Sequence, residues 1–119
     1  MTTSTRAQIG SRGEDLAADY LRAGGFEILY RNWRCRYGEI DIIAANREVL
    51  VFVEVKTRTG QGFGTPAESV THTKLRRLRR LVGIWLAAQN GSWPSVRIDV
   101  IEVRLRGSVV ELTHIAGVS

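Results

Sequence analysis

The sequence predicts an α/β fold in which helices flank a mixed five-stranded sheet, with elements in the order α-β-β-β-α-β-β. Two segments carry apolar residues at helical spacing, and five carry the apolar runs or alternation of strands. The run Val49–Val55 is apolar on both faces, which is typical of a central strand covered on each side. With 119 residues, the chain is expected to form one domain over residues 1–119.

Composition excludes several classes of protein. Hydrophobic residues make up 44% of the chain and charged residues 24%, as in ordinary globular proteins. No apolar run approaches the roughly 18 residues of a membrane span, and the first residues lack the apolar region of a signal peptide. We therefore expect a cytoplasmic protein that does not bind membranes. Its one cysteine, Cys35, rules out an internal disulfide.

Positive charge is concentrated in one stretch of the chain. The formal net charge is +5, and no acidic residue lies between Glu68 and Asp99. The basic residues of that stretch are Lys74, Arg76, Arg77, Arg79, Arg80 and Arg97. Concentrated positive charge suits a polyanionic partner, most simply a nucleic acid. The alternative is an ordinary solvated helix face.

The first helix is expected from about Thr5 to Ala23. Thr5 and Gln8 fit a capping box, but Gly10 and Gly13 weaken the early turns and allow a start near Ser11. The expected strands are Phe26–Trp33, Glu39–Ala45, Glu48–Lys56, Val96–Val103 and Val109–Ile115.

A hairpin is expected around Asn46-Arg47, the strongest turn signal in the chain. With these two residues as the turn, Glu54 faces Glu39 and Phe52 faces Asp41. A glycine-rich connection, Thr57–Gly64, follows the hairpin.

The second helical region begins with a capping box and a proline at Thr65–Glu68. One helix, or a broken pair of helices, is expected to continue to about Ala88. Trp85 lies in its apolar stripe, and the three tryptophans are expected to pack in the core or at its edge rather than stack on bases.

Three charged residues interrupt apolar strands. Asp41 lies within Ile40–Ile43, while Glu54 and Lys56 share one face of the next strand. In the expected register, Asp41 and Glu54 are diagonal neighbours roughly 7–8 Å apart between backbones. A hard cation such as Mg²⁺ would relieve the repulsion of two buried carboxylates. The alternative is a structural ion pair between Lys56 and one of these acids.

Three segments resemble the motifs of the PD-(D/E)XK nuclease superfamily: Gly13-Glu14-Asp15, Tyr37–Asp41 and Val53–Thr57. From about residue 8 to 115, the chain is similar to the YraN-like family of uncharacterised bacterial proteins. The segments Arg31–Ala44 and Phe52–Arg58 indicate this resemblance much more specifically than the three-residue pattern Glu-x-Lys alone.

This resemblance implies a restriction-endonuclease-like fold, as in archaeal Holliday-junction resolvases, and an endonuclease that uses Mg²⁺ or Mn²⁺ on branched or damaged DNA. It implies Asp41, Glu54 and the Val55 carbonyl as metal ligands. It also implies Lys56 as the catalytic lysine and Glu14 as the carboxylate that completes the catalytic set. Resolvase-like relatives act as dimers, so the resemblance also implies that this protein could form a homodimer.

Basic residues around this set are expected to contact the nucleic acid. They are Arg34, Arg36, Lys74, Arg76, Arg77 and Arg80. Asp99 is either a second carboxylate site or a structural partner of Arg97. His72 and His114 have no metal-ligand spacing and no nearby Ser or Cys nucleophile, so triad chemistry is not expected.

Three functions remain open from the sequence. The first is a metal-dependent endonuclease, and the second is a nucleic-acid-binding module that keeps the nuclease fold without turnover. The third is a protein-interaction domain that docks an acidic partner on its basic helix. The complete set Glu14, Asp41, Glu54 and Lys56 favours the first, and the acid-free stretch favours either nucleic-acid function over the third.

Overall fold

The computed structural model describes residues 5–60 and 70–118. Its elements are α1 (Arg6–Ala23), β1 (Glu27–Cys35), β2 (Gly38–Ala45), β3 (Leu50–Thr59), α2 (His72–Ala87), β4 (Val96–Arg106) and β5 (Val109–Ile115). The predicted order of elements is confirmed. Within the described ranges, no helix combines the length and the apolar character needed to cross a membrane.

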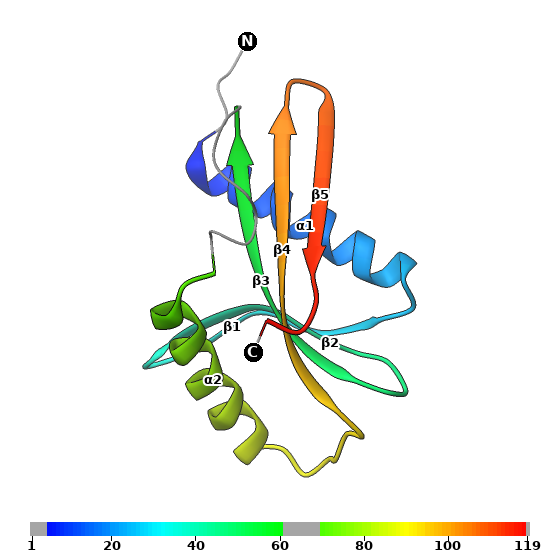
Figure 1. Cartoon of the computed structure of the whole chain (residues 1–119), viewed down its shortest axis with the longest axis vertical. Coiled ribbons are helices and arrows are strands. Elements are labelled where there is room, and N and C mark those ends of the chain that lie inside the picture. The colour runs from blue at the N-terminus through cyan, green and yellow to red at the C-terminus, as the bar shows by residue number, and fades with distance from the viewer. Residues whose placement is uncertain (1–4, 61–69, 119) are drawn as a thin grey trace.

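The five strands form one mixed sheet in the order β1-β2-β3-β4-β5. Neighbouring strands are antiparallel except β3 and β4, which run parallel over residues 50–59 and 96–105. Parallel neighbours require a crossover connection, and α2 lies within it. The two helices lie on opposite faces of the sheet (Figure 1).

The core has two halves, separated by the sheet. Val51 and Val53 of β3 pack in the cluster beneath α1, whereas Leu50 and Phe52 pack in the cluster beneath α2. This confirms burial on both faces for Leu50–Val53, while the rest of β3 is half-buried up to its exposed last residue. Trp85 is buried against Phe52 with ring centroids 5.5 Å apart, and the other two tryptophans pack against the same cluster, as predicted.

Helix α1 begins at Arg6, with the predicted capping box between Thr5 and Gln8. A later start, which the sequence allowed because of its two early glycines, is therefore wrong. Gly13 is buried because α1 crosses β3 here: a Cβ on Gly13 would lie 1.8 Å from Thr57 Oγ1. The glycine thus permits close contact between the helix and the sheet.

The predicted hairpin is present, but its register differs by two residues. The strands pair Ala45 with Leu50 and Ile43 with Phe52, so Phe52 does not face Asp41 and Glu54 does not face Glu39. The cause is the Asn46 side chain, whose Oδ1 accepts hydrogen bonds from the amides of Glu48 and Val49. Asn46 is therefore the first residue of the turn, and not a central one.

Several element ends also differ from the prediction. β3 continues through Thr57–Thr59, which the sequence assigned to the glycine-rich connection, because these residues remain paired with β4. α2 begins at His72, where the Thr71 hydroxyl accepts a hydrogen bond from the Lys74 amide. The proposed capping box at residues 65–68 lies outside the described residues.

Candidate functional site

The sheet divides beside the predicted site. The ladder between β2 and β3 ends at the pair Ile42–Val53, while β3 stays paired with β4 as far as Thr59. Figure 1 shows β3 continuing beside β4 while β1 and β2 turn away toward α2. We call this division the fork, defined by Asp41 on β2 and by Glu54, Val55 and Lys56 on β3.

At the fork, the Asp41 side chain accepts the hydrogen bond that a backbone carbonyl of β2 would accept in a continuing ladder. Asp41 Oδ2 accepts a hydrogen bond from the Val55 amide at 2.8 Å. The amide and carbonyl of one strand residue point to the same side, so the Val55 carbonyl also points toward β2. The fork therefore brings one carboxylate and one backbone carbonyl together. Asp41 and Glu54 are the next residues beyond the last pair, Ile42–Val53, so the predicted register, which placed them as diagonal neighbours, is wrong.

An irregularity in β1 and β2 accompanies this geometry. Along β2, Ile40 packs on the α2 side and Ile42 on the α1 side, so the usual alternation is broken at Asp41. The facing position on β1 is Asn32, which has a left-handed backbone with φ of 53°. Asparagine tolerates this conformation better than most residues. Sequence reasoning missed Asn32, although asparagine inside a strand is itself an unusual signal.

Negative charge accumulates around Asp41. The pKa of Asp41 is raised to about 7, mainly by burial; the charges of Glu14, Glu54 and Glu39 also raise it, and the hydrogen bond from the Val55 amide opposes the rise. The carboxylates predicted from the sequence are therefore close enough to interact electrostatically. A cation placed among them would relieve their repulsion.

Glu14 reaches the fork from α1. It lines a cleft of about 420 Å³ together with Val55 and Lys56, where the Gly13 contact holds the helix against β3. Burial raises the pKa of Glu14, while Arg31 and a hydrogen bond from Asn32 oppose the rise. The structure thus brings the expected third carboxylate to the same cleft as the expected lysine.

Lys56 does not form the structural ion pair that was its alternative role. Among the described residues, it makes no ion pair with Asp41 or Glu54. Glu54 instead pairs with Arg77 of α2, with 3.6 Å between Oε1 and Nη2. Arg77, expected to contact nucleic acid, therefore serves as an internal counter-charge in this structure.

The donor set at the fork fits a hard divalent cation. In the described part of the chain, no three Asp, Glu, His or Cys side chains are arranged to ligate one ion. Mg²⁺, however, is commonly held by one or two carboxylates together with other oxygen donors and water. Asp41, Glu54 and the Val55 carbonyl supply oxygen donors of that kind, with neither thiolate nor imidazole.

The other expected nucleic-acid contacts lie along α2 and the β1–β2 hairpin. Arg80 stacks on the Tyr37 ring, and Arg36 lies near the same ring. Arg34 pairs with Glu39 at 2.9 Å. Arg76 is exposed on α2, and Lys74 is half-buried in its first turn.

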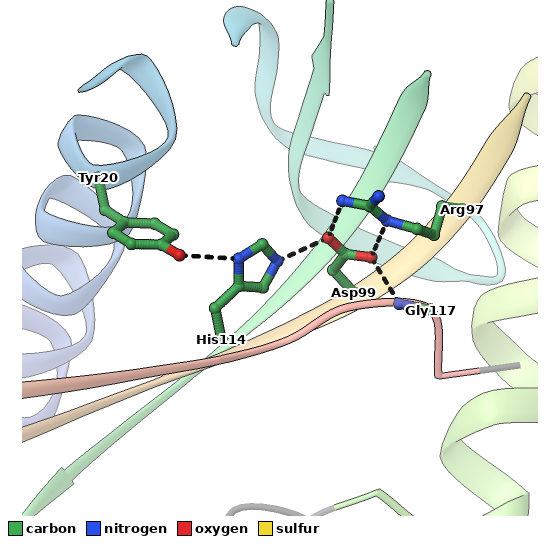
Figure 2. A network of polar contacts seen from close by, with 5 residues as sticks. All are labelled: Tyr20, Arg97, Asp99, His114 and Gly117. Carbon is green, nitrogen blue, oxygen red and sulfur yellow. Dashed lines mark hydrogen bonds and ion pairs between the residues drawn. The ribbon is translucent and has the colours of Figure 1, made fainter. Parts of the chain in front are cut away.

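Asp99 belongs to a separate network on the α1 side (Figure 2). It is fully buried and accepts two hydrogen bonds from Arg97, one from the Gly117 amide and one from His114 Nε2 at 2.6 Å. His114 Nδ1 lies 3.0 Å from the Tyr20 hydroxyl. The prediction that Asp99 is a structural partner of Arg97 is thus confirmed. Sequence spacing could not reveal the Tyr20 contact, which joins residues 94 positions apart.

Comparison with known proteins identifies the family. The model of the uncharacterised protein family UPF0102 matches residues 13–103, which include Glu14, the fork and α2. The chain belongs to the UPF0102 family. It is 59% identical over 118 residues to a UPF0102 protein of Mycolicibacterium vanbaalenii, covering 98% of both chains. It is 56% identical over 121 residues to one of Mycobacterium marinum, covering 99% of each.

A UPF0102 protein of Mycobacterium tuberculosis is 56% identical over 124 residues, covering 99% of this chain and 97% of that one. Each of these alignments therefore extends over nearly the whole length of this chain and of the relative. The family name specifies no activity.

Proposed function

We propose that this UPF0102 protein is a metal-dependent endonuclease that hydrolyses phosphodiester bonds in DNA. The hydrogen bond from the Val55 amide to Asp41 is the observation that carries the proposal. The bond lies where the β2–β3 ladder ends, so the Asp41 carboxylate lies at the Val55 backbone. Glu54 and Lys56 are the two residues of β3 on either side of Val55.

Asp41, Glu54 and the Val55 carbonyl would hold Mg²⁺ or Mn²⁺. Such an ion supplies a lowered pKa for a bound water and stabilises negative charge on a phosphoryl oxygen. Lys56 shares the cleft with Glu14, so its ammonium group can hold a phosphate oxygen and orient the attacking water. Basic side chains of α2 bind the DNA backbone beside the fork.

Cleavage assays on single-stranded, duplex and branched DNA, with and without Mg²⁺ or Mn²⁺, test this proposal. Cleavage should require the metal and should be abolished by Asp41→Asn. Lys56→Ala should lose about a hundredfold or more in rate while still binding DNA. Asp19→Asn is the matched control, because Asp19 is an exposed carboxylate on α1 that pairs only with Arg22 among the described residues.

Metal-independent cleavage, or the same rate for Asp41→Asn as for the parent protein, would overturn the assignment. Failure to cleave any substrate in either metal would leave a second candidate, a non-catalytic DNA-binding module.

One observation favours that second candidate. The Arg77 guanidinium lies 3.6 Å from Glu54, so a cationic side chain already compensates one of the proposed metal ligands. Calorimetric titration of Mn²⁺ into Arg77→Gln separates the two candidates. An endonuclease should keep or increase its metal affinity when this competitor is removed, whereas a binding module should bind no metal in either form.

A further inference from the structure

Tyr37 is a large aromatic residue that the fold leaves at the surface. It lies with Arg36 at the tip of the β1–β2 hairpin, between the paired residues Cys35 and Gly38. Of its surface, 42% is exposed. Trp33, in contrast, packs into the cluster beneath α2. Burial in the core therefore does not account for an aromatic side chain at this tip.

Two guanidinium groups accompany the Tyr37 ring. The Cζ atom of Arg80 lies 3.8 Å from the ring centroid, and that of Arg36 lies 5.2 Å away. The Arg80 contact is a close cation–π stack, which restricts the ring before any ligand arrives. Binding a partner on this ring would consequently cost little additional side-chain entropy.

The ring lies close to the fork. Arg80 is three residues from Arg77, so the two are neighbours on one flank of α2, and Arg77 contacts Glu54. The hairpin tip packs on the same flank: a Cβ on Gly38 would lie 3.9 Å from Arg77 Cδ. Figure 1 shows this tip beside α2. About one helical turn therefore separates the stacked ring from the residue that pairs with Glu54.

An exposed ring flanked by cations suits one class of ligand particularly well. An unpaired nucleobase offers a free face for stacking, and its phosphates can pair with arginine. Within a duplex, neighbouring base pairs cover those faces. We infer that Tyr37, backed by Arg80, is a stacking platform for an unpaired nucleobase, and that the substrate at the fork therefore contains a single-stranded segment. The inference rests on the proposed function for its nucleic-acid partner.

The test compares binding of a labelled single-stranded oligonucleotide with binding of the corresponding duplex, by fluorescence anisotropy in EDTA. Tyr37→Ala should weaken single-strand binding about ten- to a hundredfold, with a change of no more than about twofold for the duplex. Tyr37→Phe keeps the ring and should restore single-strand binding. Tyr30→Ala is the matched control, because Tyr30 is 50% exposed but packs on Trp85 rather than on an arginine.

Stacking itself is measured with 2-aminopurine placed in the single strand. Its fluorescence should be quenched on binding to the parent protein and to Tyr37→Phe, and not on binding to Tyr37→Ala. Thermal melting of each variant confirms that the fold is intact.

Equal losses on single strand and duplex, or no quenching by the parent protein, would refute the stacking role. If the parent protein binds neither oligonucleotide, the proposed function fails together with this inference. If Asp41-dependent cleavage occurs while Tyr37→Ala binds single strands as the parent does, this inference alone fails.

Discussion

Asp41 Oδ2 lies 2.8 Å from the Val55 amide nitrogen, where a continuing ladder would have placed a backbone carbonyl. Because the Asp41 side chain accepts this hydrogen bond in place of the main chain, the backbone pairing of β2 and β3 ends here. The hydrogen bond also keeps Asp41 half-buried near the charges of Glu14 and Glu54, and the pKa of Asp41 is raised to about 7, mainly by burial. This geometry is therefore unfavourable for the fold at neutral pH.

Asp41→Asn should change how the stability of the metal-free protein depends on pH. The pKa of Asp41 is about 7 in the folded protein and near its ordinary 3.8 when unfolded. The folded state thus retains a proton that the unfolded state loses, and this contribution declines as pH rises from about 4 to 7. The asparagine variant should become progressively more stable than the parent over this range.

Urea denaturation in EDTA at several pH values measures the effect. Asp19→Asn should parallel the parent protein throughout. A constant difference between Asp41→Asn and the parent from pH 4 to 8 would show that burial does not perturb Asp41.

Gly13→Ala should destabilise the fold, whereas Gly10→Ala should not. The added methyl group at Gly13 would meet Thr57 Oγ1 at 1.8 Å, so α1 must move away from β3. Overpacking of this kind costs about 1–3 kcal/mol. At Gly10 nothing lies within 4 Å, and alanine should stabilise the helix by roughly 0.5–1 kcal/mol.

Urea unfolding compares the two glycine variants. Because the Gly13 contact also holds Glu14 beside the fork, Gly13→Ala should lower the proposed nuclease activity more than its stability loss explains. A Gly13→Ala protein as stable as the parent would contradict the packing argument.

Arg80→Gln should reduce the salt dependence of DNA binding more than Arg79→Gln does. Arg80 shares the flank of α2 that faces Tyr37, while Arg79 lies on the opposite flank of the buried stripe. Each phosphate contact contributes about −0.9 to the slope of log affinity against log salt on duplex DNA, and about −0.7 on single strands. Anisotropy titrations over a series of salt concentrations give both slopes. Equal slopes for the two variants would place the DNA elsewhere.

Asp99→Asn should be strongly destabilising at neutral pH. It leaves Arg97 without its buried carboxylate partner, a change that costs about 3 kcal/mol or more. Asp19→Asn removes an exposed ion pair and should cost less than about 1 kcal/mol.

The penalty of Asp99→Asn should also depend on pH. Burial alone would raise the pKa of Asp99, but hydrogen bonds from Arg97, Gly117 and His114 hold it below its ordinary 3.8. The stability it contributes is therefore present above pH 4 and declines as acid protonates the folded protein. Denaturation at pH 7 and below pH 3 measures this, and a penalty that grows in acid would contradict it.

Local sequence patterns were sufficient for much of the fold. The two-sided apolar run of β3 indicated its central place, and Thr5 with Gln8 indicated the start of α1. Asp41 and Glu54 are conspicuous in the sequence because carboxylates are unexpected in apolar strands. Their exact relation was missed, since Asn46-Arg47 and Arg47-Glu48 are both plausible turns and the Asn46 side chain selects the second.

The sequence by itself determined the order of elements, the faces that each buries and the residue types available for chemistry, because these follow from periodicity and side-chain polarity. Only the tertiary structure decided which polar groups meet. Val55 with Asp41, Arg77 with Glu54 and Tyr20 with His114 are contacts between different elements. Such contacts depend on strand register, on the left-handed backbone conformation of Asn32 within β1 and on the approach of helices to the sheet, none of which a local pattern encodes.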